Sequence, residues 1–430
     1  MPNFESIRPY RDEEVPCVVR RLAANAALRD GLASFLFPRL YKSSAVATRL
    51  LVRVFLAWRV RSLTSVHDVQ IMVGEFIDRM VEASVDHLSF SGLEALDSSK
   101  PYLFVSNHRD IALDSAFLNR VLHGEGFPTC QIAVGDNLFG SSHGHADDLM
   151  RLNRGFLVER SAVGAKATYA AMQRTSSYVR QSIAQGTSVW IAQRAGRAKD
   201  GFDRTEPALL KMLGLAFRKE FSRLDELLEA VQIVPVAISY ELDPCDLLKA
   251  QELSLRAREA NFEKPAGSDL ASIVAGLRGY KGRVHLHFAS PLAGRFESAE
   301  DIARAIDVAI VGGLKVYPTN VVARDLLREL LVTQPPASFD QLSWPAQQVT
   351  TETDHERSAA FFQQRLEDAD ETLRPFLLLQ YANLLRNQSE LGVLGPPRVT
   401  PATGKGTPAG ASQSAETARQ ARHRELDDPR

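Results

Sequence analysis

Hydrophobic residues recur at helical spacing in the first part of the chain. Between residues 13 and 86 glycine is rare, and apolar side chains follow one another at intervals of three and four, as in Leu51, Phe55 and Trp58. This spacing places the apolar residues on one face of a helix. The pattern predicts a helical N-terminal region, residues 1–86, built from two or three helices.

From residue 87 the pattern changes to short apolar runs separated by helical stretches. This alternation predicts an α/β domain over residues 87–318. The expected strands cover residues 87–90, 102–106, 129–134, 156–158, 188–192, 233–239 and 284–288. The expected connecting helices cover residues 114–123, 164–184, 207–230 and 299–312.

The strand pattern stops beyond Tyr317. Helical spacing in residues 321–333 and 354–387 predicts C-terminal helices within residues 319–390. Residues 391–430 are rich in Pro, Gly, Ala, Ser and charged residues. Because such a segment has too few apolar side chains to form a core, we expect a disordered tail.

Composition and charge narrow the range of functions. The chain has 430 residues, of which 45% are hydrophobic and 24% charged, so a folded protein is expected. The net charge of -1 gives no general electrostatic argument for nucleic acid as a partner, although a local basic face could bind an anion. Three isolated cysteines fit neither a disulfide framework nor a zinc pattern, which agrees with a reducing cytosol.

The distribution of apolar residues also bears on location. The first residues lack the basic and then apolar pattern of a secretory signal. No uncharged run approaches the roughly 20 residues that a membrane-spanning helix needs. The expected location is therefore the cytoplasm, with peripheral attachment to the inner face of the membrane as the alternative.

The segment YLFVSNHRDIALDSAFLNRV, residues 102–121, has the pattern of a buried strand, a polar turn and a helix. The carboxyl end of a strand is a favoured place for a site in α/β folds. His108 is suited to proton abstraction near neutral pH, and Asp110 or Asp114 could orient its ring. Taken alone, the segment is more simply a surface turn in which Asp114 or Ser115 caps the helix.

Cationic side chains follow two further predicted strands. Arg160 lies near the end of GFLVERS, and SVWIAQRAGRAKDG places Arg194, Arg197 and Lys199 after a strand. Gly196 allows the backbone to approach a ligand closely. Each cation alone is more simply part of a solvated loop. Together with the histidine they form a set suited to a phosphate.

The ordered segments SNHRDIALD, GFLVERS, WIAQRAGRAKDG and IVPVAISYE resemble the four sequence blocks of the glycerolipid acyltransferases, the glycerol-3-phosphate and 1-acylglycerol-3-phosphate acyltransferase superfamily. The resemblance covers residues 87 to about 290 and implies an acyltransferase-type α/β fold. It assigns family roles to these residues: His108 with Asp114, Arg160, Gly196 with Arg197, and Pro235. Two features depart from the family: the His-x5-Asp spacing is one residue longer than usual, and Ala195 replaces a glutamate.

The resemblance implies acyl transfer from a thioester, acyl-CoA or acyl carrier protein, to a hydroxyl of glycerol 3-phosphate or 1-acylglycerol 3-phosphate. His108 would remove the hydroxyl proton with Asp114 or Asp110 behind it, and a backbone N–H near Gly196 would stabilise the oxyanion. The cations that would contact the acceptor phosphate are Arg160, Arg197, Lys199 and, second in rank, Arg194. No metal or other cofactor is implied. A non-catalytic lipid- or phosphate-binding module is the alternative, supported by Ala195 and the longer spacing.

The segment ATRLLVRVFLAWRVRSL interleaves Arg49, Arg53, Arg59 and Arg61 with apolar residues. A basic amphipathic helix can lie on an anionic membrane surface, which makes such a surface a candidate partner. Packing of the apolar stripe against the α/β domain explains the same pattern and is the favoured interpretation.

Two groups of histidines have simple structural interpretations. His143 and His145, with Asp147 and Asp148, lie in a glycine-containing segment without a fixed ligand spacing, so an exposed loop is favoured over a metal site. The alternation of His285 and His287 places both on one face of a predicted strand.

Overall fold

The computed structural model describes residues 3–136, 144–217, 224–259, 261–265, 267–333 and 352–393. Contacts group Met1–Pro396 as one compact unit, so the boundaries proposed within it at residues 86 and 318 stay predictions. The predicted tail lies outside the described residues from residue 394 onward.

The N-terminal region contains more and shorter helices than the two or three expected. Its α-helices are α1 (Val15–Ala24), α2 (Ala26–Leu36), α3 (Pro38–Ser43), α4 (Ala45–Arg59) and α5 (Val66–Ser84). The side chains of Asn25, Ser44 and Ser65 accept hydrogen bonds from backbone N–H groups at the starts of α2, α4 and α5. Because each cap starts a new helix, it interrupts the apolar spacing that suggested longer ones.

The strands form one seven-stranded sheet in the described part of the chain, in the order β1-β7-β6-β2-β5-β3-β4. Their bounds are β1 Val85–Ser91, β2 Leu103–Ser106, β3 Gln131–Gly135, β4 Gly155–Val158, β5 Val189–Ala192, β6 Ile233–Tyr240 and β7 Gly282–Phe288. All neighbours pair in parallel except β6 and β7. The predicted strands and the α/β fold class are confirmed.

The helices between the strands match the expected ones only in part. Those present are α6 (Leu113–Gly124), α7 (Gly144–Leu152), α8 (Ala165–Ala184), α9 (Pro207–Leu213), α10 (Leu224–Val231), α11 (Asp246–Arg258), α12 (Ser268–Arg278) and α13 (Ala299–Gly313). The single helix expected over residues 207–230 is wrong, because a 3-10 turn at Gly214–Ala216 ends its first part. Helices α7, α11 and α12 were not predicted.

The C-terminal helices are α14 (Pro318–Thr333), α15 (Glu352–Asp368) and α16 (Arg374–Glu390). The helical stretch expected over residues 354–387 consists of two helices, because the chain turns after Asp368 and Pro375 occupies the first turn of α16. The single-turn 3-10 helices of the described chain are η1 (Asp12–Glu14), η2 (Val60–Ser62), η3 (Leu93–Ala95) and η4 (Gly214–Ala216).

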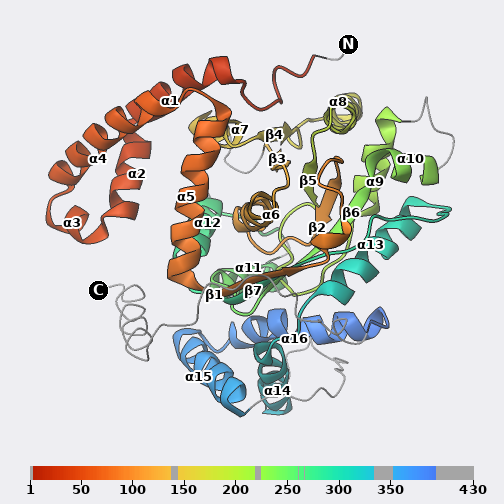
Figure 1. Ribbon diagram of the computed structural model, residues 1–430. Helices are drawn as coiled ribbons and strands as arrows, with labels where there is room; N and C mark the ends of the chain where they lie inside the picture. Colours follow the sequence, from red (N-terminus) through yellow and green to blue (C-terminus); the bar gives the residue numbers. More distant parts are fainter. Residues whose placement is uncertain are drawn as a thin grey trace. The chain divides into compact units, whose positions relative to one another are not determined.

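Helices cover both faces of the sheet (Figure 1). Alternate residues of β2 point to opposite faces: Leu103 and Val105 join the core under α8 and α13, whereas Phe104 joins the core under α5 and α6. A sheet buried on both faces needs nearly continuous apolar strands, which explains why the strands could be predicted. Because β2 to β6 run in one direction, the loops that follow β2, β4, β5 and β6 meet at one edge of the sheet.

No single helix of the described residues is both long and apolar enough to cross a membrane. Helices α13 and α14 together have the length and apolar composition of a membrane span, but the chain bends by 100° between them.

Candidate active site

The loop after β2 begins at Asn107, whose side chain continues the hydrogen bonding of the sheet. Its Nδ2 donates to the Ile238 carbonyl at 3.0 Å, and its Oδ1 accepts from the Ile238 N–H at 2.8 Å. The side chain therefore occupies the position of a further strand residue beside β6. These two bonds fix the point at which the chain leaves the sheet, and His108 follows directly.

His108 and Asp114 form a hydrogen-bonded pair. The His108 Nδ1 lies 2.9 Å from the Asp114 Oδ2, and the carboxylate is fully buried at the start of α6. Because an ionised carboxylate only accepts hydrogen bonds, Nδ1 carries the ring proton and Nε2 carries the lone pair. The His108 side chain is 15% exposed. This arrangement gives the imidazole the tautomer that a general base requires.

Three further donors hold Asp114 in place. The N–H groups of Arg109 and Asp110 donate to its Oδ2 at 2.7 and 3.0 Å, and the Tyr240 hydroxyl donates to its Oδ1 at 2.9 Å. Burial, together with the Asp114 charge, raises the pKa of Tyr240 well above its ordinary value, so this hydroxyl stays a donor. The carboxylate is therefore fixed on all sides before any substrate binds.

Asp110 has a different set of contacts. Its Oδ1 accepts from the N–H groups of Ala112 and Leu113, both at 2.9 Å, and so closes the turn that leads into α6. Burial and the nearby charge of Asp114 raise the pKa of Asp110. This turn accommodates the extra residue of the His-x5-Asp spacing, which is why the longer spacing still brings Asp114 to the imidazole.

The turn after β5 lies against the His108 loop. The Ala198 N–H donates to the His108 carbonyl at 2.8 Å. Gly196 has a φ of +77°, which favours glycine, and a β-carbon placed there would meet nothing within 4 Å. The open space beside this backbone is where the predicted oxyanion donor would have to act.

The arginines of this turn retain unused donors. Arg197 is 7% exposed, and its Nη2 donates to the Ser272 hydroxyl at 3.0 Å. Its Nη1 and the Nε of Arg194 are buried and have no hydrogen-bond partner among the described residues. Both arginines can therefore still donate to an anion.

The other two predicted phosphate ligands are placed differently. Lys199 forms an ion pair with Glu252 at 3.1 Å, and burial lowers the pKa of its ammonium, although Glu252 opposes that effect. Arg160 follows β4 with an exposed side chain, and its N–H donates to Asp136 at 2.9 Å. The structure thus brings His108, Asp114 and Arg197 into one neighbourhood. To bind a phosphate, Lys199 would have to release the Glu252 carboxylate.

Several residues of this site do not follow from the sequence pattern. Tyr240 lies one residue beyond the predicted strand, and Asp203 pairs with Arg109 from the loop after β5. Lys249 and Ser272 come from the unpredicted helices α11 and α12. An aromatic hydroxyl at the end of an apolar strand was the available signal for Tyr240. Nothing in the apolar pattern indicates the other three.

The proposed exposed loop at residues 143–148 is in part the helix α7. His143 and the side chain of His145 lie outside the described residues. Asp148 is buried, accepting from the Tyr10 hydroxyl at 2.6 Å and pairing with Arg21 at 2.7 Å. Within the described ranges, no group of three His, Cys, Asp or Glu side chains is arranged to hold a metal ion.

A small cavity lies next to Arg109. Its volume is about 40 Å³, and its lining includes Arg109, Tyr240, Asp243, Lys315, Gln380 and Tyr381. His108 and Asp114 are not part of this lining. The cavity has room for a few water molecules only, so it is not the acyl-binding site.

Part of the chain is similar to a known protein family. Residues 87–239 match the family model described as Acyltransferase. Over these residues the chain is similar to that family, which confirms the recognition based on the sequence blocks.

The similarity of the chain to solved structures is weaker. The crystal structure of the 1-acyl-sn-glycerophosphate (LPA) acyltransferase PlsC from Thermotoga maritima is similar with 15% identity and a TM-score of 0.33, over 65% of this chain and 92% of that one. No curated protein matches the chain significantly.

Proposed function

We propose that the protein is an O-acyltransferase that moves a fatty acyl group from a thioester, acyl-CoA or acyl carrier protein, to a hydroxyl of glycerol 3-phosphate or 1-acylglycerol 3-phosphate in phospholipid synthesis. The observation that carries the proposal is the His108–Asp114 pair at the carboxyl edge of the sheet, with Nε2 unbonded by any described residue. It lies within the segment that matches the acyltransferase family.

The reaction needs one base and one oxyanion donor. The Nε2 of His108 takes the proton of the acceptor hydroxyl while its oxygen attacks the thioester carbonyl. Asp114 stabilises the resulting imidazolium, and an N–H beside Gly196 donates to the oxyanion. When the tetrahedral intermediate collapses, the carbon–sulfur bond breaks and the thiolate takes the proton from His108. Arg197 and Arg160 bind the acceptor phosphate.

Release of free thiol tests this proposal. Acyl-CoA and acyl carrier protein are each incubated with the protein, with and without glycerol 3-phosphate, 1-acylglycerol 3-phosphate and glycerol. We expect thiol release that depends on a phosphorylated acceptor and falls about 10² to 10⁴-fold in His108→Ala. His123→Ala, which removes an exposed histidine of α6, is the matched control and should retain full activity. A folded, fully active His108→Ala variant would contradict the mechanism, and acceptor binding without thiol release would favour the non-catalytic module.

The surface of α4 supports peripheral membrane attachment. Val46, Val54 and Trp58 are 75, 63 and 66% exposed, and Leu50 and Phe55 extend the same apolar stripe. Packing of this stripe on the α/β domain was the favoured interpretation, and it is wrong for these side chains: the contacts of α4 are mainly with α2 and α3. An exposed apolar patch of this kind marks an interaction surface.

We propose an anionic lipid bilayer as the partner of this stripe. Arg53 and Arg61 lie on the same segment and are exposed, so that cations flank an apolar face as in interfacial helices. A lipid acceptor would be met at such a surface. The inner face of the membrane is the corresponding location.

Vesicle sedimentation tests the partner. We expect binding to phosphatidylglycerol-containing vesicles that weakens with salt, is at least about tenfold weaker in Arg53→Glu, and is weaker still in Val54→Ser/Trp58→Ser. Lys166→Glu reverses an exposed charge on α8 and should bind normally. Self-association without vesicle binding would identify a second copy of the chain as the occupant and contradict the proposal.

A further inference from the structure

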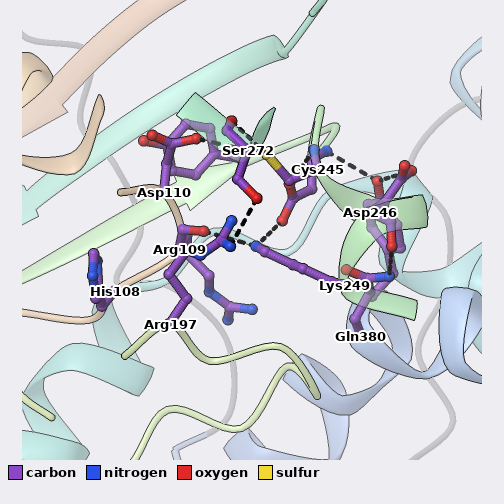
Figure 2. A network of polar contacts seen from close by, with 12 residues as sticks. His108, Arg109, Asp110, Arg197, Cys245, Asp246, Lys249, Ser272 and Gln380 are labelled. Carbon is purple, nitrogen blue, oxygen red and sulfur yellow. Dashed lines mark hydrogen bonds and ion pairs between the residues drawn. The ribbon is translucent and has the colours of Figure 1, made fainter. Parts of the chain in front are cut away.

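Arg109, the residue that follows His108, is held at both its side chain and its backbone. Its guanidinium pairs with Asp203, whose side chain is fully buried. Its carbonyl accepts a hydrogen bond from the Lys249 ammonium at 2.7 Å. Figure 2 shows the Lys249 side chain extending from α11 to the backbone of Arg109. Both contacts direct Arg109 into the protein, although its neighbour His108 is the base of the proposed reaction.

Lys249 is an unusual side chain to bury. It is 1% exposed, and its only described counterion is Asp243. Burial raises the pKa of Asp243, but the Lys249 ammonium more than offsets this and holds the pKa below its ordinary value. A buried ion pair is weak evidence for stability, because desolvation offsets most of the Coulomb attraction. Stability alone therefore does not account for a buried lysine at this position.

Helix α16 forms hydrogen bonds with the segments that contain Asp243 and Asp203, the partners of Lys249 and Arg109. The Tyr381 hydroxyl accepts from the Asp243 N–H and donates to the Asp246 carboxylate, both at 2.9 Å. The Asn383 amide donates to the Asp200 carbonyl at 2.7 Å, in the same loop as Asp203. One helix thus braces both groups that hold Arg109. It lies outside the segment that matches the acyltransferase family.

We propose that Lys249 is a positioning residue for His108. By holding the Arg109 carbonyl it fixes the Arg109–Asp110 peptide, and the N–H groups of both these residues donate to the carboxylate that orients the imidazole. The C-terminal helix α16 acts through the same contacts, because it braces α11. The effect on turnover rests on the proposed acyltransferase function, whereas the ordering of the loop does not.

A pair of variants separates positioning from stability. Lys249→Met leaves the Asp243 carboxylate buried without its partner, so it should be strongly destabilised. Lys249→Met/Asp243→Asn removes both charges and should recover most of that stability, but it cannot restore the bond to the Arg109 carbonyl. We expect kcat in the double variant to stay at least about tenfold below wild type at matched folded fraction, with KM little changed. Lys281→Met, which removes another buried lysine that donates to the Gly279 carbonyl, is the matched control and should retain kcat.

Amide hydrogen exchange of residues 107–112 gives a readout that does not depend on activity. Faster exchange in both Lys249 variants, with unchanged exchange in Lys281→Met, is expected. Wild-type kcat in the double variant would overturn the inference while leaving the proposed function in place. If the wild-type protein shows no acyl transfer, the proposed function fails, and unchanged exchange at residues 107–112 in the double variant would then overturn the positioning role separately.

Discussion

Two histidines and two serines form a partly buried chain of hydrogen bonds between β1 and β7. His285 contacts the Ser89 hydroxyl through Nδ1 at 2.8 Å and the Ser91 hydroxyl through Nε2 at 3.1 Å, and Ser91 also contacts the Nδ1 of His287 at 2.9 Å. His285 is 3% exposed. Burial, with the nearby Lys315 charge, lowers the pKa of His285 from 6.5 to about 3. Because this histidine is neutral in the folded protein, acid should destabilise the fold.

The sign and size of this acid destabilisation follow from the pKa of His285 in the unfolded and in the folded protein. Between pH 6.5 and about 3 the unfolded histidine binds a proton that the folded one does not, so stability is fully present above pH 6.5 and falls as the pH is lowered. At pH 5 the difference from the unfolded pKa is about 1.5 units, and each unit is worth about 1.4 kcal/mol. His285 alone should therefore lower the free energy of unfolding by about 2 kcal/mol between pH 7 and 5.

A variant must isolate this contribution, because another buried group has the opposite effect. Burial raises the pKa of Asp246 to about 6, so its folded form retains a proton and stability falls as the pH rises from 3.8 toward 6. The assay is urea unfolding of wild type and His285→Gln at pH 7, 6 and 5. Glutamine keeps a donor and an acceptor for the serines but does not titrate.

The contribution of His285 is the difference between wild type and His285→Gln in how much the free energy of unfolding changes with pH. Wild type should lose about 2 kcal/mol more than His285→Gln between pH 7 and 5. His67→Gln, which replaces an exposed histidine of α5, should follow wild type at each pH. A stability difference between wild type and His285→Gln that does not change with pH would refute the reasoning.

Three further predictions concern the site. Asp114→Asn should lower kcat by about 10²-fold or more, whereas Asp110→Asn should mainly lower stability, because of these two carboxylates only Asp114 contacts the imidazole. The kcat values of the two variants are compared at matched folded fraction, and a larger loss in Asp110→Asn would reverse the assignment. Arg160→Ala and Arg197→Ala should impair the use of glycerol 3-phosphate more than that of glycerol, and equal losses in acceptor assays would argue against phosphate binding. Gly276→Ala should lower the free energy of unfolding in urea by about 1–3 kcal/mol, since its methyl group would lie 2.3 Å from the Asp110 Oδ2. Unchanged stability would contradict this, because it would mean that the Asp110 side chain can move away without cost.

The parts of the fold that could be predicted are those in which apolar side chains carry the pattern. Strands buried on both faces, such as β2 and β6, are continuous apolar runs. Helix α11 shows why others were missed: its buried residues include Lys249, Glu252 and Ser254, which hydropathy assigns to a solvated face. A helix that buries polar side chains does not produce an apolar stripe.

The residues of the candidate site also fall into those that the sequence predicts and those that it does not. His108 and Asp114 are close in sequence, so a turn followed by a helix is enough to bring them together. Tyr240 and Lys249 reach the same loop only through the sheet order and the packing of α11. Long-range partners of this kind leave no local spacing in the sequence. The first contacts of the base could thus be predicted, and the groups that hold those contacts could not.

Buried charge is concentrated at this edge of the sheet. Burial raises the pKa of both Asp110 and Asp203, and Asp203 keeps one carboxylate oxygen without a hydrogen-bond partner among the described residues. Lys249 and Arg197 are buried nearby. Each such group loses its hydration on burial, so stability alone does not favour a charged residue over a well-packed apolar one at these positions. Their common feature is that they surround the loop of His108. A cost in stability around one imidazole is expected where the orientation of that imidazole matters more than the stability of the fold.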